Sequence, residues 1–244
     1  MLVAIHQPNY LPWLGYLDRM AKADLFIVLD HVQFERRNYQ NRTQILLEGE
    51  ARWLTVPVVQ LSQKETIIEK RVDNSEGGSR LWGPTHFKTL RYAYRKAPYF
   101  DHYAPALQEI LEARWDRLVD LNMAAIRFLR DAFEIRTPLR LSSQMKAEGA
   151  RSDLLLNLCR EVSPKATFLG GLGGSRRYLD QDAFARAGIG VQWQALEHPV
   201  YPQCGAGAFQ PGLTALDILF NVGPRAAEHL HQQATRAPDE RVAA

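Results

Sequence analysis

Three side chains able to move a proton stand just after short apolar runs in this chain. His6, Asp30 and His198 each lie where such a run gives way to a turn. An imidazole in this position can act as a general acid or base, contact a phosphate or bind a metal, and a neighbouring group can orient it. We therefore predict His6 as a general base oriented by Asp30 or Gln7, and His198 as a second acid–base or phosphate-binding group.

The turn that follows His6 is rigid and rich in polar and aromatic residues. Two prolines and an asparagine within residues 8–12 disfavour a helix there, and a helix is expected to begin near Trp13. Aromatic rings beside a proton acceptor can pack on a ring of a ligand. The predicted binding residues of this stretch are Gln7, Asn9, Tyr10, Trp13 and Tyr16.

Two further stretches suit an anionic ligand. Residues 36–42 combine arginines with asparagine and tyrosine, and a guanidinium can hold a phosphate or carboxylate through two donors. Residues 170–175 form a glycine-rich loop between a predicted strand and a predicted helix, where backbone amides can approach an anion. The predicted anion-binding residues are Asn38, Asn41, Arg42, Gly171, Gly173, Gly174 and Ser175.

The segment that begins at His198 repeats the chemistry of the first turn. It adds Tyr201 and Gln203 as predicted binding residues, whereas Cys204 lacks the electropositive setting that a nucleophilic thiolate needs. No paired cysteines and no tight histidine spacing indicate a metal, so no metal site is predicted. A zinc-type hydrolase that uses His6, Asp30, His31 and His198 remains an alternative.

These residues require an α/β fold to bring them together. Residues 2–5, 25–29, 139–141, 166–169 and 191–196 are predicted strands, separated by segments with helical periodicity. In an open parallel sheet, ligands bind at the carboxyl ends of the strands. The predicted fold is therefore α/β, with a mostly parallel sheet flanked by helices.

The chain between the second and third of these strands is predicted as an insert at about 32–135. It contains a β-hairpin, with strands at 43–47 and 52–59, a short strand at 66–72, and helices from about 80 to 135. Helices are also expected at 152–161, 177–187 and 213–220. We predict one α/β domain over residues 1–235 and a disordered tail at 236–244.

The composition is that of an ordinary globular protein. A net charge of +3 in 244 residues gives no direct sign of nucleic-acid binding, and the two cysteines suit a reducing compartment. The first residues enter a strand at once, so we expect no signal peptide, no membrane insertion and a cytoplasmic location. The sequence does not indicate an oligomeric state.

Several of the motifs together resemble the WbqC-like protein family. They are IHQPNYLPWLGYLDRMAKAD at the start, the LD and HVQF that follow, NR at 41–42, WLTVPV at 53–58, RYLD at 177–180, and HPVYPQ ahead of LTALDILFNVGP at 213–224. The resemblance runs from residue 1 to about 225. It implies a role in glycan or sugar-nucleotide metabolism among bacterial surface-polysaccharide genes, including O-antigen synthesis, but it assigns neither a reaction nor catalytic residues.

A fainter likeness concerns layout alone. A strand, a proline-containing turn and Pro12 to Tyr16 at a helix start are similar in arrangement to the HxGH element of nucleotidylyltransferases. Trp13 and Tyr16 stand where that element has histidines, so nucleotide binding without that chemistry is what the likeness implies.

The function predicted from all of this is an enzyme of surface-polysaccharide biosynthesis. It would transfer a group to or from an anionic activated small molecule, such as a sugar nucleotide or an acyl or aminoacyl donor, with histidine as general acid or base. The cofactor is unknown, and a nucleotide-linked or coenzyme-linked donor would fit. The alternatives are a non-catalytic binding or scaffold protein of the same pathway and the metal-dependent hydrolase.

Overall fold

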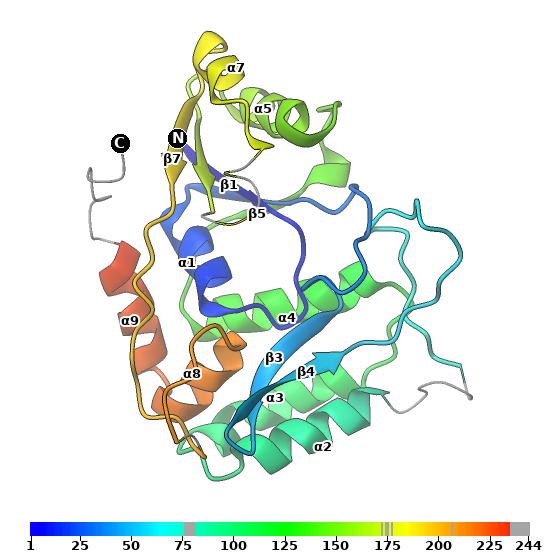
Figure 1. Ribbon diagram of the computed structural model, residues 1–244, viewed down its shortest axis with the longest axis vertical. Coiled ribbons are helices and arrows are strands. Elements are labelled where there is room, and N and C mark those ends of the chain that lie inside the picture. Colours follow the sequence, from blue (N-terminus) through cyan, green and yellow to red (C-terminus); the bar gives the residue numbers. More distant parts are fainter. Residues whose placement is uncertain (76–81, 172, 174–175, 177, 206, 235–244) are drawn as a thin grey trace.

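A five-stranded parallel sheet forms the upper part of the molecule, and most of the helices lie below it (Figure 1). The computed structural model describes residues 1–75, 82–171, 173, 176, 178–205 and 207–234. The strand order is β5-β2-β1-β6-β7. The strands are β1 (Leu2–His6), β2 (Leu25–Val28), β5 (Leu139–Leu141), β6 (Thr167–Gly170) and β7 (Gly190–Trp193). The predicted α/β fold with a parallel sheet is confirmed.

Alternate residues of each strand pack on opposite faces of the sheet, because successive side chains of a strand point in opposite directions. Ala4 and Phe26 belong to the large core that includes α1 (Leu14–Lys22), whereas Val3 and Ile27 belong to a second core. The second core is completed by α5 (Arg151–Val162) and α7 (Gln181–Arg186). Burial on both faces explains the nearly continuous apolar runs of the sequence.

The chain changes direction at the centre of this sheet. From β1 it passes through α1 to β2, and from β5 it returns through α5 to β6 on the other side of β1. The register pairs Ala4 with Leu169, so the chain leaves the sheet at His6 and Gly171 along the same edge. Such a switch point at the carboxyl ends of parallel strands is the usual place for a ligand in open α/β sheets.

The lower part of the molecule consists of an antiparallel hairpin and helices (Figure 1). The predicted hairpin is present, and it packs on the helices through Leu46, whose amide donates to the hydroxyl of Tyr94 at 2.9 Å. The elements are β3 (Arg42–Leu47), β4 (Glu50–Thr55), α2 (Trp82–Tyr94), α3 (Phe100–Glu112), α4 (Leu118–Ala132), α8 (Ala215–Val222) and α9 (Arg225–Ala234).

Several elements differ from the prediction. Strand β4 ends at Thr55 and β7 at Trp193, each three or four residues earlier than predicted, and α8 ends at Val222 instead of Phe220. Residues 66–72 form no strand, and only isolated bridges pair Thr66, Arg71 and Val72 with neighbouring segments. Helix α7 begins at Gln181, because the carboxylate of Asp180 accepts a hydrogen bond from the amide of Ala183 and caps it there. Helix α9 was not predicted. The expected tail at 236–244 lies outside the described residues.

Helices of the described part of the chain are too short or too polar to cross a membrane.

Candidate active site

The turn after β1 is held from four sides. Asn122 of α4 donates to the carbonyl of Pro8 at 3.0 Å, and the amide of Tyr10 donates to the carbonyl of Tyr39 at 2.9 Å. The carbonyl of Leu11 accepts from the hydroxyls of Thr43 and Thr214. These bonds attach the turn to α4, to the segment before the hairpin, to the hairpin and to the start of α8.

Backbone strain accompanies this fixation. Leu11 has a φ of 42°, in the left-handed region that non-glycine residues rarely adopt. Such strain costs of order 1–3 kcal/mol and persists only where the surrounding structure fixes it, and it is common at ligand sites. The turn is therefore a rigid support for the residues on either side of it.

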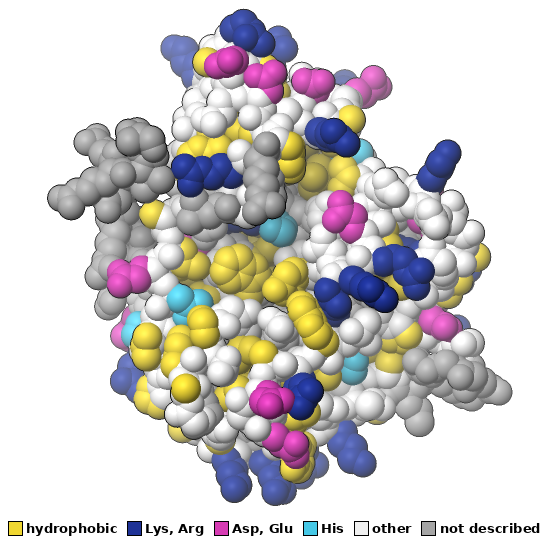
Figure 2. Space-filling model, in the orientation of Figure 1, with side chains coloured by type: hydrophobic (Ala, Val, Ile, Leu, Met, Phe, Trp, Pro, Cys, Tyr) yellow, Lys and Arg dark blue, Asp and Glu magenta, His cyan; other side chains and the backbone are white. Residues whose placement is uncertain are grey.

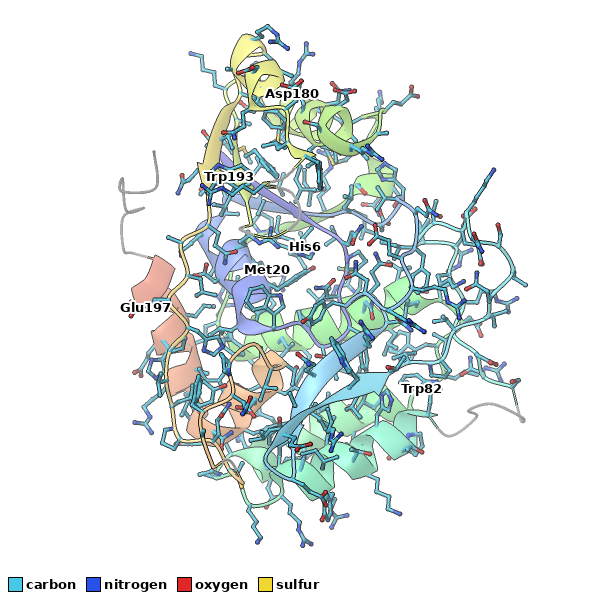
Figure 3. All side chains as sticks on the ribbon, viewed as in Figure 1. His6, Met20, Trp82, Asp180, Trp193 and Glu197 are labelled. Atoms are coloured by element: carbon cyan, nitrogen blue, oxygen red, sulfur yellow. The ribbon has the colours of Figure 1, made fainter. Side chains whose placement is uncertain are left out.

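His6 stands at the beginning of this turn, half-buried, in the middle of the molecule beside α1 (Figure 3). Its Nδ1 lies 2.9 Å from the carbonyl oxygen of Gln7, which can only accept, so Nδ1 carries the proton. Burial, together with the nearby positive charge of Arg19, lowers the pKa of His6 to about 3. At neutral pH the ring is uncharged, and Nε2 presents a lone pair.

Tyr16 and Arg19 of α1 complete the surroundings of His6. The rings of His6 and Tyr16 meet edge to face with centroids 4.9 Å apart. Tyr16 is fully buried and Arg19 is 6% exposed, yet the hydroxyl of Tyr16 and Nε of Arg19 have no hydrogen-bond partner among the described residues. Burial lowers the pKa of Arg19 to about 10, so it stays cationic at neutral pH.

Arg19 also joins α1 to the loop after β6. A side chain at Gly171 would begin 2.8 Å from Nη1 of Arg19, so the guanidinium occupies the space that this glycine leaves. The site therefore spans the ends of β1 and β6, which are neighbours at the switch point of the sheet.

Arg19 was missed by the sequence prediction, and Tyr16 was predicted only as a ring that packs on a ligand. The apolar residues of α1 predicted the buried face of the helix and gave no role to the polar side chains beside it. The available signal was the spacing of Tyr16 and Arg19, which at i and i+3 lie on the same side of a helix.

The negative charge of Asp18, the residue before Arg19, already has partners. Asp18 is fully buried, and its carboxylate lies 2.9 Å from Nζ of Lys22 and accepts from Nε2 of Gln194 at 2.6 Å. Gln194 also donates to the carbonyl of Gly15, which ties the chain after β7 to α1.

The basic segment 36–42 lies against the turn, as Nε2 of Gln40 donates to Oε1 of Gln7 at 2.9 Å. Its predicted binding residues mostly bond within the chain. Asn38 donates to Glu35 and Asn41 to the carbonyl of Val56. Arg42 donates to the carbonyl of Arg37, and its guanidinium lies 4.0 Å from the centre of the Trp53 ring.

The surface of this region is mixed in character. Figure 2 shows hydrophobic side chains at the centre of the face, a histidine above them, and Lys and Arg side chains to the right. Trp53, 41% exposed, is one of the large apolar side chains that reach solvent.

Asp30 does not orient His6 in this structure. Its Oδ1 accepts from the hydroxyl of Ser142 at 2.9 Å and from the amide of Ser143 at 2.8 Å, and its Oδ2 accepts from the hydroxyl of Ser143 at 2.6 Å. His31 contacts Ser142 as well, through Nδ1 at 2.6 Å. These bonds join β2 to the 3-10 turn (Ser142–Gln144) after β5, which is a structural task.

His198, Tyr201 and Gln203 lie in a different cluster, around Asp217 of α8. Oδ1 of Asp217 accepts from the hydroxyl of Tyr201 at 2.8 Å and from Nε2 of Gln203 at 2.9 Å. Its Oδ2 accepts from the hydroxyl of Tyr94 at 3.0 Å. His198 contacts Tyr201 and the ring of Phe209, and Figure 3 shows its chain neighbour Glu197 well apart from His6.

The remaining predicted residues divide by exposure. Tyr10 is fully buried and its hydroxyl lies 2.9 Å from Nδ1 of His86, so its ring belongs to the core. Asn9 is buried, Trp13 is half-buried and packs on Gly15, and Gly173 is exposed. Gly174 and Ser175 lie outside the described residues.

Among the residues that the structure describes, no three potential metal ligands lie close enough to share an ion.

Two comparisons with known proteins place the chain among relatives. The model of the WbqC-like protein family matches residues 7–229. An uncharacterized protein of Mycobacterium tuberculosis, Rv1507c, is 32% identical over 231 residues, which cover 93% of this chain and 96% of the relative. No solved structure matches. The chain belongs to the WbqC-like family.

Proposed function

We propose that this member of the WbqC-like family is a transferase that moves a group to or from an activated small molecule. The donor would be a sugar nucleotide or an acyl or aminoacyl carrier, and the pathway would be bacterial surface-polysaccharide biosynthesis of the O-antigen type in the cytoplasm. The pathway rests on the family resemblance. The chemistry rests on one observation, a neutral His6 whose Nδ1 is bonded to the carbonyl of Gln7, which leaves Nε2 as the proton acceptor near the buried cation of Arg19.

His6 would act as the general base in this reaction. The hydroxyl or amine of the acceptor would give its proton to Nε2 while its oxygen or nitrogen forms the new bond, and the bonding pair between the transferred group and the donor would leave with the donor. The pKa of about 3 describes the protein without ligand, and the charge of Arg19 contributes to it. An anionic donor beside Arg19 would offset that charge and raise the pKa of His6 toward the working range.

The test is a turnover assay on the purified protein with a panel of sugar nucleotides and acyl-coenzyme A thioesters, read by mass spectrometry. Replacing His6→Gln should lower turnover by about 10²–10⁴-fold, the usual contribution of a general base, with little change in melting temperature. The control is His102→Gln, which changes an exposed histidine of α3. A His6→Gln protein with full activity would refute the assignment.

The low basicity of His6 also favours a second candidate, a ligand-binding protein without catalysis. A histidine with a pKa of about 3 is a weak base, and a rigid turn beside unsatisfied buried donors suits binding alone. The two candidates differ in one result. A binding protein would be stabilised by its ligand and return that ligand unchanged after long incubation, whereas the transferase would consume it once the acceptor is added.

A further inference from the structure

Tyr16 and Arg19 differ from the other buried polar residues with an unpartnered atom. Asn41, Asn122, Arg42 and Asp18 each have one atom without a hydrogen bond, but in each of them another atom of the side chain is hydrogen-bonded. The hydroxyl is the one polar atom of the Tyr16 side chain, and it has no partner among the described residues, as is also true of Nε of Arg19.

Such an arrangement is costly in the protein alone. An unsatisfied buried polar group and an unpaired buried charge each destabilise a folded chain, and native proteins usually avoid both. Arg19 takes no part in the ion pairs of the described residues. Asp18 attracts its charge, but that carboxylate is already paired with Lys22 and Gln194. Within the part of the chain that the structure describes, the site therefore has no anion that accepts a hydrogen bond from Nε of Arg19.

The donors also indicate which anion fits. A guanidinium fork uses both oxygens of a carboxylate when it binds in the bidentate manner, so the Tyr16 hydroxyl would have to share one of these oxygens. A phosphate has a third oxygen for that hydroxyl. Gly171 lets the guanidinium lie against the backbone after β6, since any side chain there would collide with Nη1.

We propose that Arg19 and Tyr16 bind a phosphate group of the ligand, with Arg19 Nε and the Tyr16 hydroxyl donating to its oxygens between the ends of β1 and β6. This inference deepens the proposed function, on which it rests for the reacting end of the ligand at His6. The phosphate would be the anionic part of a nucleotide-linked or coenzyme-linked molecule, held within reach of the proton acceptor.

The experiment is isothermal titration calorimetry of the full chain with inorganic pyrophosphate, inorganic phosphate and acetate at constant ionic strength. Pyrophosphate should bind the wild type, and Arg19→Gln should weaken this binding about tenfold or more, as expected for loss of a charged hydrogen bond. Tyr16→Phe should weaken it by a smaller factor. The matched control is Arg160→Gln, which removes an exposed arginine from α5 on the other face of the sheet and should leave the affinity unchanged.

Three results would overturn the inference. They are an unchanged pyrophosphate affinity in Arg19→Gln, no pyrophosphate binding to the wild type, and acetate binding as tight as that of pyrophosphate. If circular dichroism shows that Arg19→Gln is unfolded, Arg19→Lys replaces it, because it keeps the charge and removes Nε, and an affinity equal to that of the wild type would count against the proposal.

The His6 variant separates this inference from the proposed reaction. Loss of pyrophosphate binding in Arg19→Gln with full turnover in His6→Gln would support the phosphate site and refute the reaction. An unchanged affinity in Arg19→Gln with no turnover in His6→Gln would do the reverse.

Discussion

Two clusters of this protein each contain a buried tyrosine hydroxyl but differ in how their polar atoms are satisfied. Around Asp217, both carboxylate oxygens accept hydrogen bonds, from Tyr94, Tyr201 and Gln203. Beside His6, the hydroxyl of Tyr16 and Nε of Arg19 have no partner among the described residues. The first cluster has acceptors for its donors, whereas the described residues supply none for these two donors of the second.

The difference separates a structural role from a binding role. The Asp217 cluster joins α2, α8 and the segment after β7, and the hydroxyl of Tyr94 extends it to the hairpin through the amide of Leu46. The cluster beside His6 joins the ends of β1 and β6 but keeps its donors free. An unsatisfied buried group costs about 1–3 kcal/mol, so keeping two of them indicates a function outside folding.

The largest expected effect is the loss of the carboxylate at the centre of the satisfied cluster. Asp217→Ala leaves the hydroxyl of Tyr201 and the amide of Gln203 without their acceptor and opens a cavity in α8. The free energy of unfolding should fall by about 3–5 kcal/mol, measured by urea denaturation. Asp116→Ala, at a largely exposed position, is the control and should change little. A loss below about 1 kcal/mol for Asp217→Ala would mean that the cluster does not hold the fold.

A smaller loss is expected when one donor of this cluster is removed. Tyr201→Phe keeps the ring and deletes the hydroxyl that donates to Oδ1 of Asp217. The free energy of unfolding should fall by about 2 kcal/mol, the value of a hydrogen bond to a charged group. Tyr92→Phe serves as the control, because Tyr92 is 59% exposed and bonds to the exposed Glu48.

Lowering the pH should reduce the stability of the folded protein, because the pKa of His6 is lower in the folded chain than in the unfolded chain. In the unfolded chain His6 takes up a proton near its ordinary pKa of 6.5, whereas in the folded chain its pKa is about 3. Between these values the unfolded state binds more protons, so stability falls as the pH falls. From pH 7 to pH 5 we expect His6 to account for about 1–2 kcal/mol of lost stability.

His6→Gln should lose that much less stability over the same pH range, as measured by denaturation at both pH values. His86, whose pKa burial lowers to about 4, is present in both proteins, so the difference isolates His6. Equal losses in the wild type and in His6→Gln would contradict a His6 that stays neutral in the folded chain.

The sequence predicted much of the fold and part of the site. The strand–turn–helix of the first residues and the glycine loop could be placed at one edge of a sheet, because apolar runs mark strands and parallel strands end together. Helix α9 was missed although Ala226, Ala227 and Leu230 give it an apolar face.

The partners that Asp30 and Tyr201 have in the structure could not be predicted from the sequence, for a physical reason. Asp30 bonds to serines more than 110 residues away, and Tyr201 bonds to Asp217, a residue of another element. Residue type and strand-end position are the same for a catalytic carboxylate and a structural one. Only the three-dimensional structure shows which polar atoms are left without a partner.

The most direct test of the central claim is the stability of Tyr16→Phe without ligand, measured beside Tyr201→Phe. If the Tyr16 hydroxyl is kept for a ligand, its removal deletes an unsatisfied buried group. The free energy of unfolding should then rise by about 1 kcal/mol, while Tyr201→Phe loses stability. A loss for Tyr16→Phe as large as that for Tyr201→Phe would contradict the account, because it would show that the hydroxyl already has a partner in the protein alone.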